Sequence, residues 1–381
     1  MASSAESVPL DIVCFSDIFW DALWQRHQQL FTRFPSNWRI LFIEPTSIPV
    51  LLKQPKRLFT RKFLNIEIVS LPSIPLIDRS ENLRWINDSL VSFWLRFILK
   101  KKNIKEPVLF YYEPRYSSLI GKLQEKMVVL DYIDDKLAFS NVPSWMKKYL
   151  DSLIEKANLI FVASSHLHKC ILETRKNDVY LIGNGVDVNH FRKAMTDIPT
   201  PDDIAHIKKP VIGYVGALSD WVDFDIIRAI GMEYPDFSVV LVGPEFPSVK
   251  NEIDSLKQYP NIFILGAKPY EVLPNYLKAF DVCIIPFKIN ELTLSSNPLK
   301  FYEYISSGKN IISINLPEVK QFDHVVYVAN NLDEFLQFIP ISLNKKVNVK
   351  EVLKITEENS WDRKSEKMIK LIIETIFRNY C

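Results

Sequence analysis

A chain of 381 residues is too long for one ordinary hydrophobic core, so its length favours two or three domains. With 48% hydrophobic and 24% charged residues, its composition is that of a soluble globular protein. The net charge of +2 at pH 7 is too balanced for a nucleic-acid-binding protein, so no nucleic-acid partner is expected.

The cysteines and the apolar runs indicate where the protein works. The four cysteines show no CxxC spacing: Cys14, Cys170, Cys283 and Cys381. Cys14 and Cys283 lie in apolar, strand-like runs, which favours buried free thiols and a reducing compartment. The N-terminal MASSAESVPLD lacks the pattern of a signal peptide, and no apolar run reaches the roughly 18–20 residues of a membrane span. We expect a cytoplasmic protein, and leave open peripheral attachment to the inner face of the cell membrane.

The first half of the chain alternates short apolar runs with amphipathic ones. The apolar runs predict strands at residues 11–16, 39–45, 66–72, 107–114, 127–133, 159–164 and 179–185. The amphipathic runs predict helices at residues 22–34, 82–101, 144–157 and 165–175. This alternation predicts a parallel sheet covered by helices. Residues 183–203, rich in Gly, Asn, Asp and Pro, predict a linker.

The alternation then restarts in the second half. Strands are predicted at residues 211–216, 237–243, 261–266, 281–287 and 310–314. Helices are predicted from about Asp223, in the stretch between 243 and 261, and at residues 271–280, 297–309 and 360–377. The sequence therefore predicts an α/β protein of two doubly wound halves, in which the cleft between the halves is the default ligand site.

The helix NPLKFYEYISSGK, residues 297–309, predicts an anion site. Asn297 is a good N-cap, Pro298 suits the first helical position, and Gly308 suits the C-terminal stop. Lys300 and Glu303 share one face, and a helix N-terminus bearing a lysine attracts phosphate. The alternative is a solvated Lys–Glu pair on an exposed face. Gly216, at the end of a strand, could let the backbone approach a phosphate or could simply make a turn.

A group of carboxylates follows the strand at residues 127–133. Asp131, Asp134 and Asp135 would crowd the edge of the expected cleft. Crowded acids raise one another's pKa, which helps to make one of them a general base. The structural alternative is an Asx turn or an N-cap, which suits Asp135 best.

Several motifs in the same order resemble the GT-B glycosyltransferases. They are GNGVD followed by Phe191, then YVGALSDWVDFD, and then NPLKFYEYISSGK. The chain is most similar to the family 4-like, or group 1, enzymes that build bacterial polysaccharides. WDALWQRHQQL and SWDRKSEKMIKLI also resemble that group. The resemblance implies a GT-B fold of two Rossmann-like domains: residues 1–195 bind the acceptor, residues 205–355 bind a nucleotide sugar, and residues 356–381 pack back on the first domain.

The resemblance also implies roles for residues of the second half. Lys300 would bind the diphosphate and Glu303 the ribose. The other donor-binding candidates are Gly216 in the phosphate loop, Gly266 and Lys268 near the base, and Asn297 at the helix start. Ser295 replaces the first glutamate of the family pattern, and Ala217 and Trp221 replace its phosphate-binding arginine and lysine. The anomeric outcome, retention or inversion, is therefore left open.

The carboxylate layout resembles that of the inverting xanthan glucuronosyltransferase. This likeness implies that Asp134 is the base, with Asp131 as the second catalytic candidate. Polar and aromatic residues after two first-half strands are candidates for acceptor binding: Asp17, Trp20, Arg26 and Glu113. Glu113 could instead pair with Arg115. The histidines show no metal-ligand spacing, and GT-B enzymes generally need no metal, so we expect no cofactor.

Basic residues interleaved with aromatic ones in residues 53–63 and 96–105 predict contact with an anionic membrane surface, or else an ordinary solvated surface. The predicted function is transfer of a sugar from a nucleotide diphosphate sugar, preferably a UDP-sugar, to a hydroxyl of a glycan or lipid-linked acceptor in cell-surface polysaccharide synthesis. The alternatives are a nucleotide-sugar epimerase of the same fold and a non-catalytic sugar-nucleotide- or glycan-binding subunit. A dehydrogenase is disfavoured because no G-x-G-x-x-G follows a predicted strand.

Overall fold

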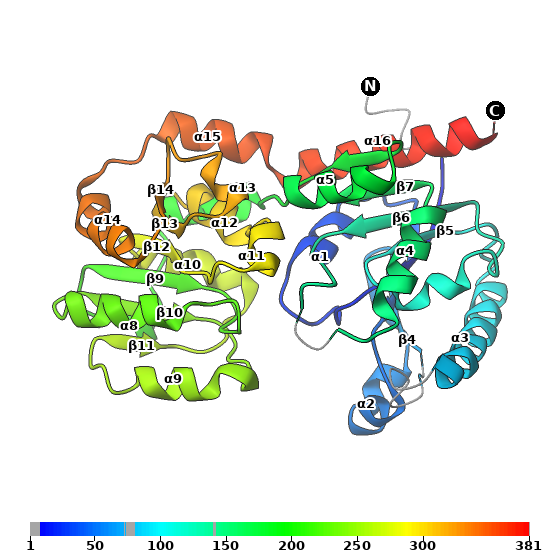
Figure 1. Ribbon diagram of the computed structural model, residues 1–381, viewed down its shortest axis with the longest axis horizontal. Helices are drawn as coiled ribbons and strands as arrows, with labels where there is room; N and C mark the ends of the chain where they lie inside the picture. Colours follow the sequence, from blue (N-terminus) through cyan, green and yellow to red (C-terminus); the bar gives the residue numbers. More distant parts are fainter. Residues whose placement is uncertain (1–7, 72, 74–80, 140–141, 381) are drawn as a thin grey trace. The chain divides into compact units, whose positions relative to one another are not determined.

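The computed structural model describes residues 8–71, 73, 81–139 and 142–380, and the chain forms two compact units (Figure 1). The first unit comprises residues 1–183 and 364–381, and the second comprises residues 184–363. Residues 1–7, on which the expectation of no signal peptide mainly rests, lie outside the described residues, as does Cys381. In the described ranges, no helix is both long and apolar enough to cross a bilayer.

Within the described residues, the first unit carries an eight-stranded sheet in the order β3-β4-β2-β1-β5-β6-β7-β8. The strands are β1 (Asp11–Phe15), β2 (Arg39–Glu44), β3 (Arg61–Phe63), β4 (Ile66–Ser70), β5 (Val108–Tyr111), β6 (Met127–Tyr132), β7 (Leu159–Val162) and β8 (Val179–Leu181). All neighbouring pairs are parallel except β3 and β4. The predicted first-half strands are confirmed. The short, mostly exposed β3 was not predicted because its three residues have no clear apolar pattern.

Helices connect these strands. They are α1 (Arg26–Phe31), α2 (Ile48–Lys53), η2 (Pro55–Leu58), α3 (Glu81–Lys101), η4 (Pro114–Leu119), α4 (Met146–Lys156) and α5 (Ser165–Thr174). The first helix is shorter than the predicted range 22–34, because Gln25 forms a capping box with Gln28 and starts the helix at Arg26.

The second unit carries a parallel sheet, six-stranded within the described residues, in the order β11-β10-β9-β12-β13-β14. The strands are β9 (Val211–Val215), β10 (Ser238–Val242), β11 (Ile262–Ile264), β12 (Val282–Ile285), β13 (Asn310–Ile314) and β14 (Tyr327–Ala329). The predicted second-half strands are confirmed, and the short β14 is additional. The central strands of both sheets are buried on two faces, which explains why these strands read as continuous apolar runs.

The helices of the second half include both short and long ones. They are α6 (Val188–Phe191), η5 (Arg192–Met195), α7 (Asp202–Ala205), α8 (Phe224–Glu233), η6 (Pro247–Val249), α9 (Lys250–Leu256), η7 (Tyr270–Val272), α10 (Leu273–Ala279), α11 (Glu291–Ser295), α12 (Leu299–Ser306), α13 (Pro317–Lys320), α14 (Leu332–Asn344), α15 (Val349–Glu358) and α16 (Trp361–Tyr380). From Lys364 onward α16 belongs to the first unit, where Arg378 pairs with Asp178 at 2.5 Å.

The segment expected to link the halves packs within the second unit. Phe191 is buried in the core of that unit, and its carbonyl accepts a hydrogen bond from the Ser307 hydroxyl at 3.3 Å. The His190 ring stacks on Tyr270, with ring centroids 4.4 Å apart. The segment is therefore anchored in the second unit by Phe191 and His190, and the division between the units falls between Gly183 and Asn184.

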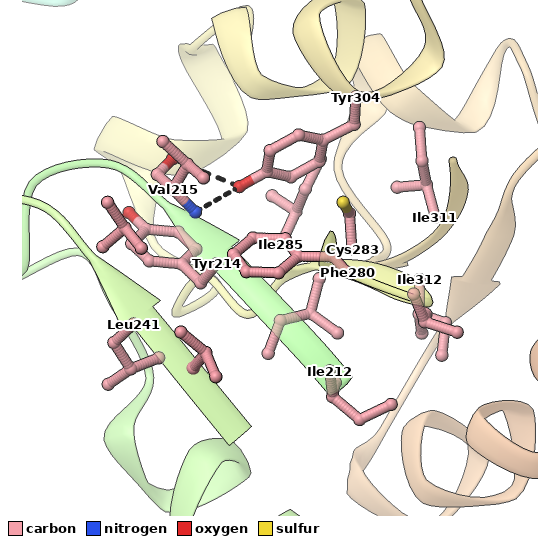
Figure 2. Packing of buried hydrophobic residues seen from close by; sticks show 14 of the residues in the cluster. Ile212, Tyr214, Val215, Leu241, Phe280, Cys283, Ile285, Tyr304, Ile311 and Ile312 are labelled. Atoms are coloured by element: carbon pink, nitrogen blue, oxygen red, sulfur yellow. Dashed lines mark hydrogen bonds between the residues drawn. The ribbon is translucent and has the colours of Figure 1, made fainter. Parts of the chain in front are cut away.

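The core of the second unit holds α12 against the end of β9 (Figure 2). The Tyr304 hydroxyl accepts a hydrogen bond from the Val215 N–H at 2.8 Å and donates one to the Val215 carbonyl at 3.1 Å. Cys283, a buried free thiol, lies in the same cluster, and Cys14 is likewise buried and free, as the sequence predicted. The core thereby fixes the position of the helix that carries Lys300 relative to the strand end that carries Gly216.

Candidate active site

A stack of three glycines lies at the carboxyl ends of β9, β10 and β11. The Gly216 N–H donates to the Val242 carbonyl at 2.7 Å, and the Gly243 N–H donates to the Gly266 carbonyl at 2.9 Å. Gly243 has φ +156°, and a Cβ atom there would overlap the Gly216 carbonyl. The strand order reverses between β9 and β12, which is where parallel α/β sheets bind ligands. Sequence reasoning missed Gly243, although it ends its strand as Gly216 does.

Lys300 reaches back from the first turn of α12 across Gly216. A Cβ atom at Gly216 would overlap the end of the Lys300 side chain, so the glycine makes room for the lysine. The ammonium also lies 5.6 Å from the centroid of the Tyr214 ring. Burial lowers the pKa of Lys300, and the nearby Glu303 carboxylate acts in the opposite direction. The structure thus brings together two residues that the sequence assigned to one phosphate site.

Glu303 lies one turn further along α12 and is half-buried, as Lys300 is. Burial raises the pKa of Glu303, and the Lys300 charge lowers it in part. In the part of the chain that the structure describes, neither side chain makes a hydrogen bond or an ion pair. The arrangement is therefore not the solvated surface pair that the spacing alone allowed, but two partly desolvated charges without a hydrogen-bond partner among the described residues.

The start of α12 differs from the prediction. The N-cap position is held by Pro298 in an extended conformation, without a side-chain cap, so the prediction that Asn297 caps the helix is wrong. Asn297 is buried, its carbonyl accepts a hydrogen bond from Asn184 at 2.7 Å, and its side chain lies 3.4 Å from Glu318. Because no side chain caps the first turn, its N–H groups remain to interact with an anion. Gly308 follows the helix with φ +67°, as predicted for a C-terminal stop.

The turn after β11 has free space beside Gly266, whereas the Lys268 side chain in the same turn is held by an ion pair. A Cβ atom at Gly266 would meet no atom within 4 Å. The Lys268 ammonium pairs with Asp203 at 2.6 Å, and the Tyr276 hydroxyl donates to the same carboxylate at 2.9 Å. Burial alone would raise the pKa of Asp203, but these two hydrogen bonds lower it. Lys268 therefore already has a partner within its own unit.

In the first unit, a cluster of charges lies at the carboxyl ends of β1, β5 and β6. Asp17 follows β1, and its two oxygens contact His27 Nε2 at 2.8 Å and Lys136 Nζ at 2.5 Å. Burial alone would raise the pKa of Asp17, but these two partners hold it well below its ordinary value. Burial would lower the pKa of Lys136, but Asp17, Glu113 and Asp134 together raise it. Sequence reasoning missed Lys136, although it follows the acidic pair directly.

Asp134 and its neighbour Asp135 differ in their environments. Burial raises the pKa of Asp134, Lys136 lowers it, and Asp17 raises it further. No hydrogen bond to its carboxylate is found among the described residues. Asp135 accepts hydrogen bonds from the Tyr132 hydroxyl at 3.1 Å and the Leu137 N–H at 2.9 Å. Asp135 thus makes the turn that the structural alternative described, whereas the Asp134 carboxylate has the raised pKa of a possible base.

Arg26 and Asp131 form a buried ion pair. Arg26 Nε and Nη2 each donate to one oxygen of Asp131 at 2.8 Å, and the two side chains are 2% and 0% exposed. Arg26 also donates to the Gly183 carbonyl at 3.2 Å. Both carboxylate oxygens are engaged and neither side chain reaches the surface. Arg26 and Asp131 therefore satisfy each other within the first unit, and the acceptor-binding role of Arg26 and the catalytic role of Asp131 remain predictions.

The remaining acceptor candidates are Trp20 and Glu113. The Trp20 ring is buried against Phe42 and Phe63, with centroid distances of 5.1 and 5.6 Å, so it belongs to the packing of the unit. Glu113 is half-buried and accepts a hydrogen bond from the Arg115 N–H at 3.1 Å. Burial raises the pKa of Glu113, and Lys136 lowers it in part. Over the described residues, no three His, Cys, Asp or Glu side chains are grouped so that they could hold a metal ion.

Residues 201–322 match the family model described as Glycosyl transferases group 1. This range contains the glycine stack, Lys300 and Glu303. A curated relative from Bacillus subtilis (strain 168), described as a putative teichuronic acid biosynthesis glycosyltransferase, TuaH, is 26% identical over 191 residues. The match covers 49% of this chain and 48% of the relative, so the chain spans about half the length of the curated relative that it matches.

Solved structures of similar architecture cover nearly the whole chain. The structure described as trehalose-6-phosphate from E. coli bound with UDP-2-fluoro glucose has a TM-score of 0.73 at 12% identity, covering 94% of this chain and 98% of the other. Sucrose-phosphate synthase from Thermosynechococcus elongatus gives 0.72 at 14% identity, with 96% and 98% covered. Anabaena HepE in complex with UDP and glucose gives 0.67 at 12% identity, with 95% and 98% covered.

Each unit has a mainly parallel sheet, with polar residues near the point where its strand order reverses. Together with the structural similarity, this architecture defines the class: the fold is that of the GT-B glycosyltransferases. Residues 201–322 are a domain of the group 1 glycosyltransferase family. The fold that the sequence motifs resembled is thereby confirmed, and the resemblance to the group 1 family is supported over residues 201–322.

Proposed function

We propose that this protein is a glycosyltransferase that moves a sugar from a UDP-sugar to a hydroxyl of a glycan or lipid-linked acceptor in cell-surface polysaccharide synthesis. One observation carries the proposal: Lys300 lies over Gly216 at the uncapped start of α12, with the unpaired Glu303 beside it. The UDP named for HepE supports the choice of donor, and the teichuronic acid pathway named for TuaH supports a polysaccharide product.

The second unit would bind the donor and stabilise its leaving group. A diphosphate at the start of α12 would receive hydrogen bonds from the first-turn N–H groups and a charge-assisted bond from Lys300. The glycines would let the backbone approach the phosphate, and Glu303 would accept hydrogen bonds from ribose hydroxyls. Gly266 and Lys268 would lie near the base. In this scheme the negative charge of the departing diphosphate is met by protein groups alone, so the proposal includes no metal or other cofactor.

The first unit would activate the acceptor. Asp134 has a raised pKa, and no described residue donates a hydrogen bond to its carboxylate, so we assign it as the general base. Lys136 and Asp17 would set its charge state, and Asp17 and Glu113 would contact acceptor hydroxyls. A hydroxyl that loses its proton to Asp134 would attack the anomeric carbon as the diphosphate leaves from the opposite face. The configuration would therefore be inverted.

We propose that the protein works in the cytoplasm and binds the inner face of the membrane peripherally. In residues 53–63, Arg57 pairs with Glu44 at 2.9 Å and Arg61 pairs with the same carboxylate at 2.6 Å. Two of the basic side chains expected to face lipid are thus partly neutralised. Lys53 and Lys56 are exposed, and they would contact the membrane surface.

Binding measurements on a Lys300→Ala variant test the donor site. Losing one charge-assisted hydrogen bond costs about 1.5–3 kcal/mol, so we expect UDP to bind about 10- to 100-fold more weakly, while uridine binding stays unchanged. Lys320→Ala, which removes an exposed lysine of the same unit, is the matched control and should bind both as the parent does. Equal UDP affinity in the Lys300 variant and the parent would reject the assignment.

Product analysis tests the reaction itself. The parent is incubated with a panel of nucleotide sugars, and the donors that raise the melting temperature are then offered lipid-linked and oligosaccharide acceptors. A glycosylated acceptor with free UDP supports the proposal. An isomerised nucleotide sugar formed without acceptor would instead identify an epimerase. Donor binding with no turnover in either assay would favour a non-catalytic binding subunit.

A further inference from the structure

Helix α3 (Glu81–Lys101) exposes a large apolar face although its inward face contains polar side chains. That inward face buries Arg84, Asn87, Asp88 and Ser92, and it also packs Val91, Leu95 and Leu99 into the core. Its outward face carries large apolar side chains: Trp85, Ile86, Leu90, Phe93, Trp94 and Phe97. Trp85 is 73% exposed, Phe93 68% and Phe97 54%. In the view of Figure 1, α3 lies at the margin of the first unit. A surface helix of a globular protein normally has a polar face toward solvent, so these exposed aromatic and aliphatic side chains call for an explanation.

The buried polar side chains fix the orientation of α3. The Arg84 guanidinium lies 3.6 Å from the Trp145 ring centroid and 4.0 Å from that of Tyr149, and it donates to the Arg115 carbonyl at 3.0 Å. The Ser118 hydroxyl donates to Asp88 at 2.5 Å. Turning the helix to bury its aromatic side chains would break these contacts and would expel a guanidinium from its aromatic cage. The aromatic face is therefore held outward by the fold.

The outward side chains form one stripe with a cationic end. Ile86, Leu90, Trp94 and Phe97 recur at intervals of three and four residues, and the Trp94 ring lies 6.3 Å from both the Phe93 and the Phe97 rings. Lys100 and Lys101 are exposed at the C-terminal end of the stripe. Among residues 84–101 the single acidic residue is Asp88, which is buried. The exposed face is thus aromatic and positive, without a compensating negative charge.

We propose that the outward face of α3 is a membrane-docking surface that lies in the interface of an anionic bilayer. Its rings enter the boundary between headgroups and acyl chains, about 5–10 Å deep, while Lys100 and Lys101 contact headgroup phosphates. A second copy of the chain would present the same positive face and so no counter-charge, whereas an anionic lipid surface supplies it. This surface is independent of the proposed activity, and it differs from residues 53–63 in that apolar insertion, more than charge, holds the protein.

Co-sedimentation with vesicles tests the surface. We expect the full chain to bind phosphatidylcholine vesicles containing 30% phosphatidylglycerol and to retain part of this binding in 0.5 M salt, which screens charge but not apolar contacts. A Phe93→Gln/Phe97→Gln variant should bind at least tenfold more weakly. The matched control, Met232→Gln/Phe377→Gln, removes two apolar side chains that are 64% and 53% exposed elsewhere, and it should bind as the parent does.

Brominated lipids give a second, site-specific readout. Bromine atoms on the acyl chains should quench the fluorescence of Trp85 and Trp94. A Trp85→Phe/Trp94→Phe variant should therefore bind the vesicles but lose most of the quenching. Absence of binding at low salt, equal binding by the Phe93/Phe97 variant, or equal quenching in the tryptophan variant would each overturn the proposal. A lipid-free dimer of the parent that the Phe93/Phe97 variant cannot form would overturn it too, because the occupant would then be a second copy.

Discussion

The two units handle charge in opposite ways. In the first unit, buried charges are paired: Arg26 with Asp131, and Asp17 with His27 and Lys136. In the second unit, Lys300 and Glu303 are half-buried side by side, without a hydrogen bond or ion pair to any described residue. Their pKa values are shifted mainly by burial, each toward its neutral form.

This difference separates charges that serve the fold from charges available to a ligand. Removing one partner of a buried pair leaves an uncompensated buried charge, which destabilises the protein. A desolvated charge without a partner contributes nothing to the fold, and its free energy improves only when a ligand supplies the missing charge or hydrogen bonds. Asp134 is the exception in the first unit, because no described residue donates to its carboxylate. Substitutions of paired and unpaired groups test this distinction between structural charges and charges available to a ligand.

Asp134→Asn tests the unpaired carboxylate of the first unit. General-base catalysis typically contributes about 10²–10⁴-fold, so we expect turnover to fall by that factor while UDP affinity stays near that of the parent. Asp135→Asn is the control, and it should cost much less because Asp135 only holds a turn. Steady-state kinetics with the identified donor and acceptor measure both. Near-normal turnover of the Asp134 variant, or a product with retained configuration, would contradict the inverting scheme.

Arg26→Leu tests the paired side of the comparison. The substitution leaves Asp131 charged and buried without its partner, which costs about 3–5 kcal/mol in the free energy of unfolding. Arg39→Leu is the matched control, since Arg39 pairs with Asp11 at 2.5 Å but is 56% exposed; exposed pairs contribute about 1 kcal/mol or less. Urea titration monitored by circular dichroism measures both. Equal losses in the two variants would break the distinction between structural and surface pairs.

Gly216→Ala tests whether the second unit keeps space for the lysine. Gly216 has φ +152°, and an added Cβ would overlap the end of Lys300, so we expect about 1–3 kcal/mol of strain and weaker UDP binding together. Gly121→Ala supplies the control: its φ is +82° and no atom lies within 4 Å of the added Cβ. The Gly121 variant should lower the free energy of unfolding without changing UDP affinity. If UDP affinity is intact in the Gly216 variant, the glycine does not shape the phosphate site.

The smallest effects are expected in residues 53–63, where an exposed lysine can be compared with a paired arginine. Lys53 is exposed, and each lysine near an anionic membrane contributes about 1 kcal/mol, so Lys53→Gln should weaken vesicle binding about fivefold. Arg57→Gln removes a partner of the buried Glu44, so we expect it to lower the melting temperature and to change vesicle binding less. Vesicle co-sedimentation and thermal unfolding are measured on both variants. The reverse pattern would mean that Arg57 faces lipid.

The sequence predicted the fold well because strand and helix patterns in a parallel α/β protein are local. It also singled out Lys300 and Gly216, since strand ends and helix starts can be located from apolar runs, Gly and Pro even where the predicted cap, Asn297, was wrong. It failed where partners lie far apart along the chain. Arg26 and Asp131 are separated by 105 positions, and nothing local shows that each satisfies the other. The same limit hid the role of Lys136. The outward aromatic face of α3 likewise depends on the contacts of Arg84 with Trp145 and Tyr149, which lie at the start of α4.

The opposite pKa shifts of Lys300 and Glu303 should be detectable by calorimetry. Burial lowers the pKa of the lysine, and a bound diphosphate would raise it again, so donor binding at alkaline pH should take up protons from the buffer. Burial raises the pKa of Glu303, and hydroxyl donors would lower it, so binding at acidic pH should release protons. The heat of UDP-sugar binding should therefore depend on the ionisation enthalpy of the buffer. The sign of that dependence should reverse between the two ends of the pH range, as two opposed proton exchanges on one turn of helix require.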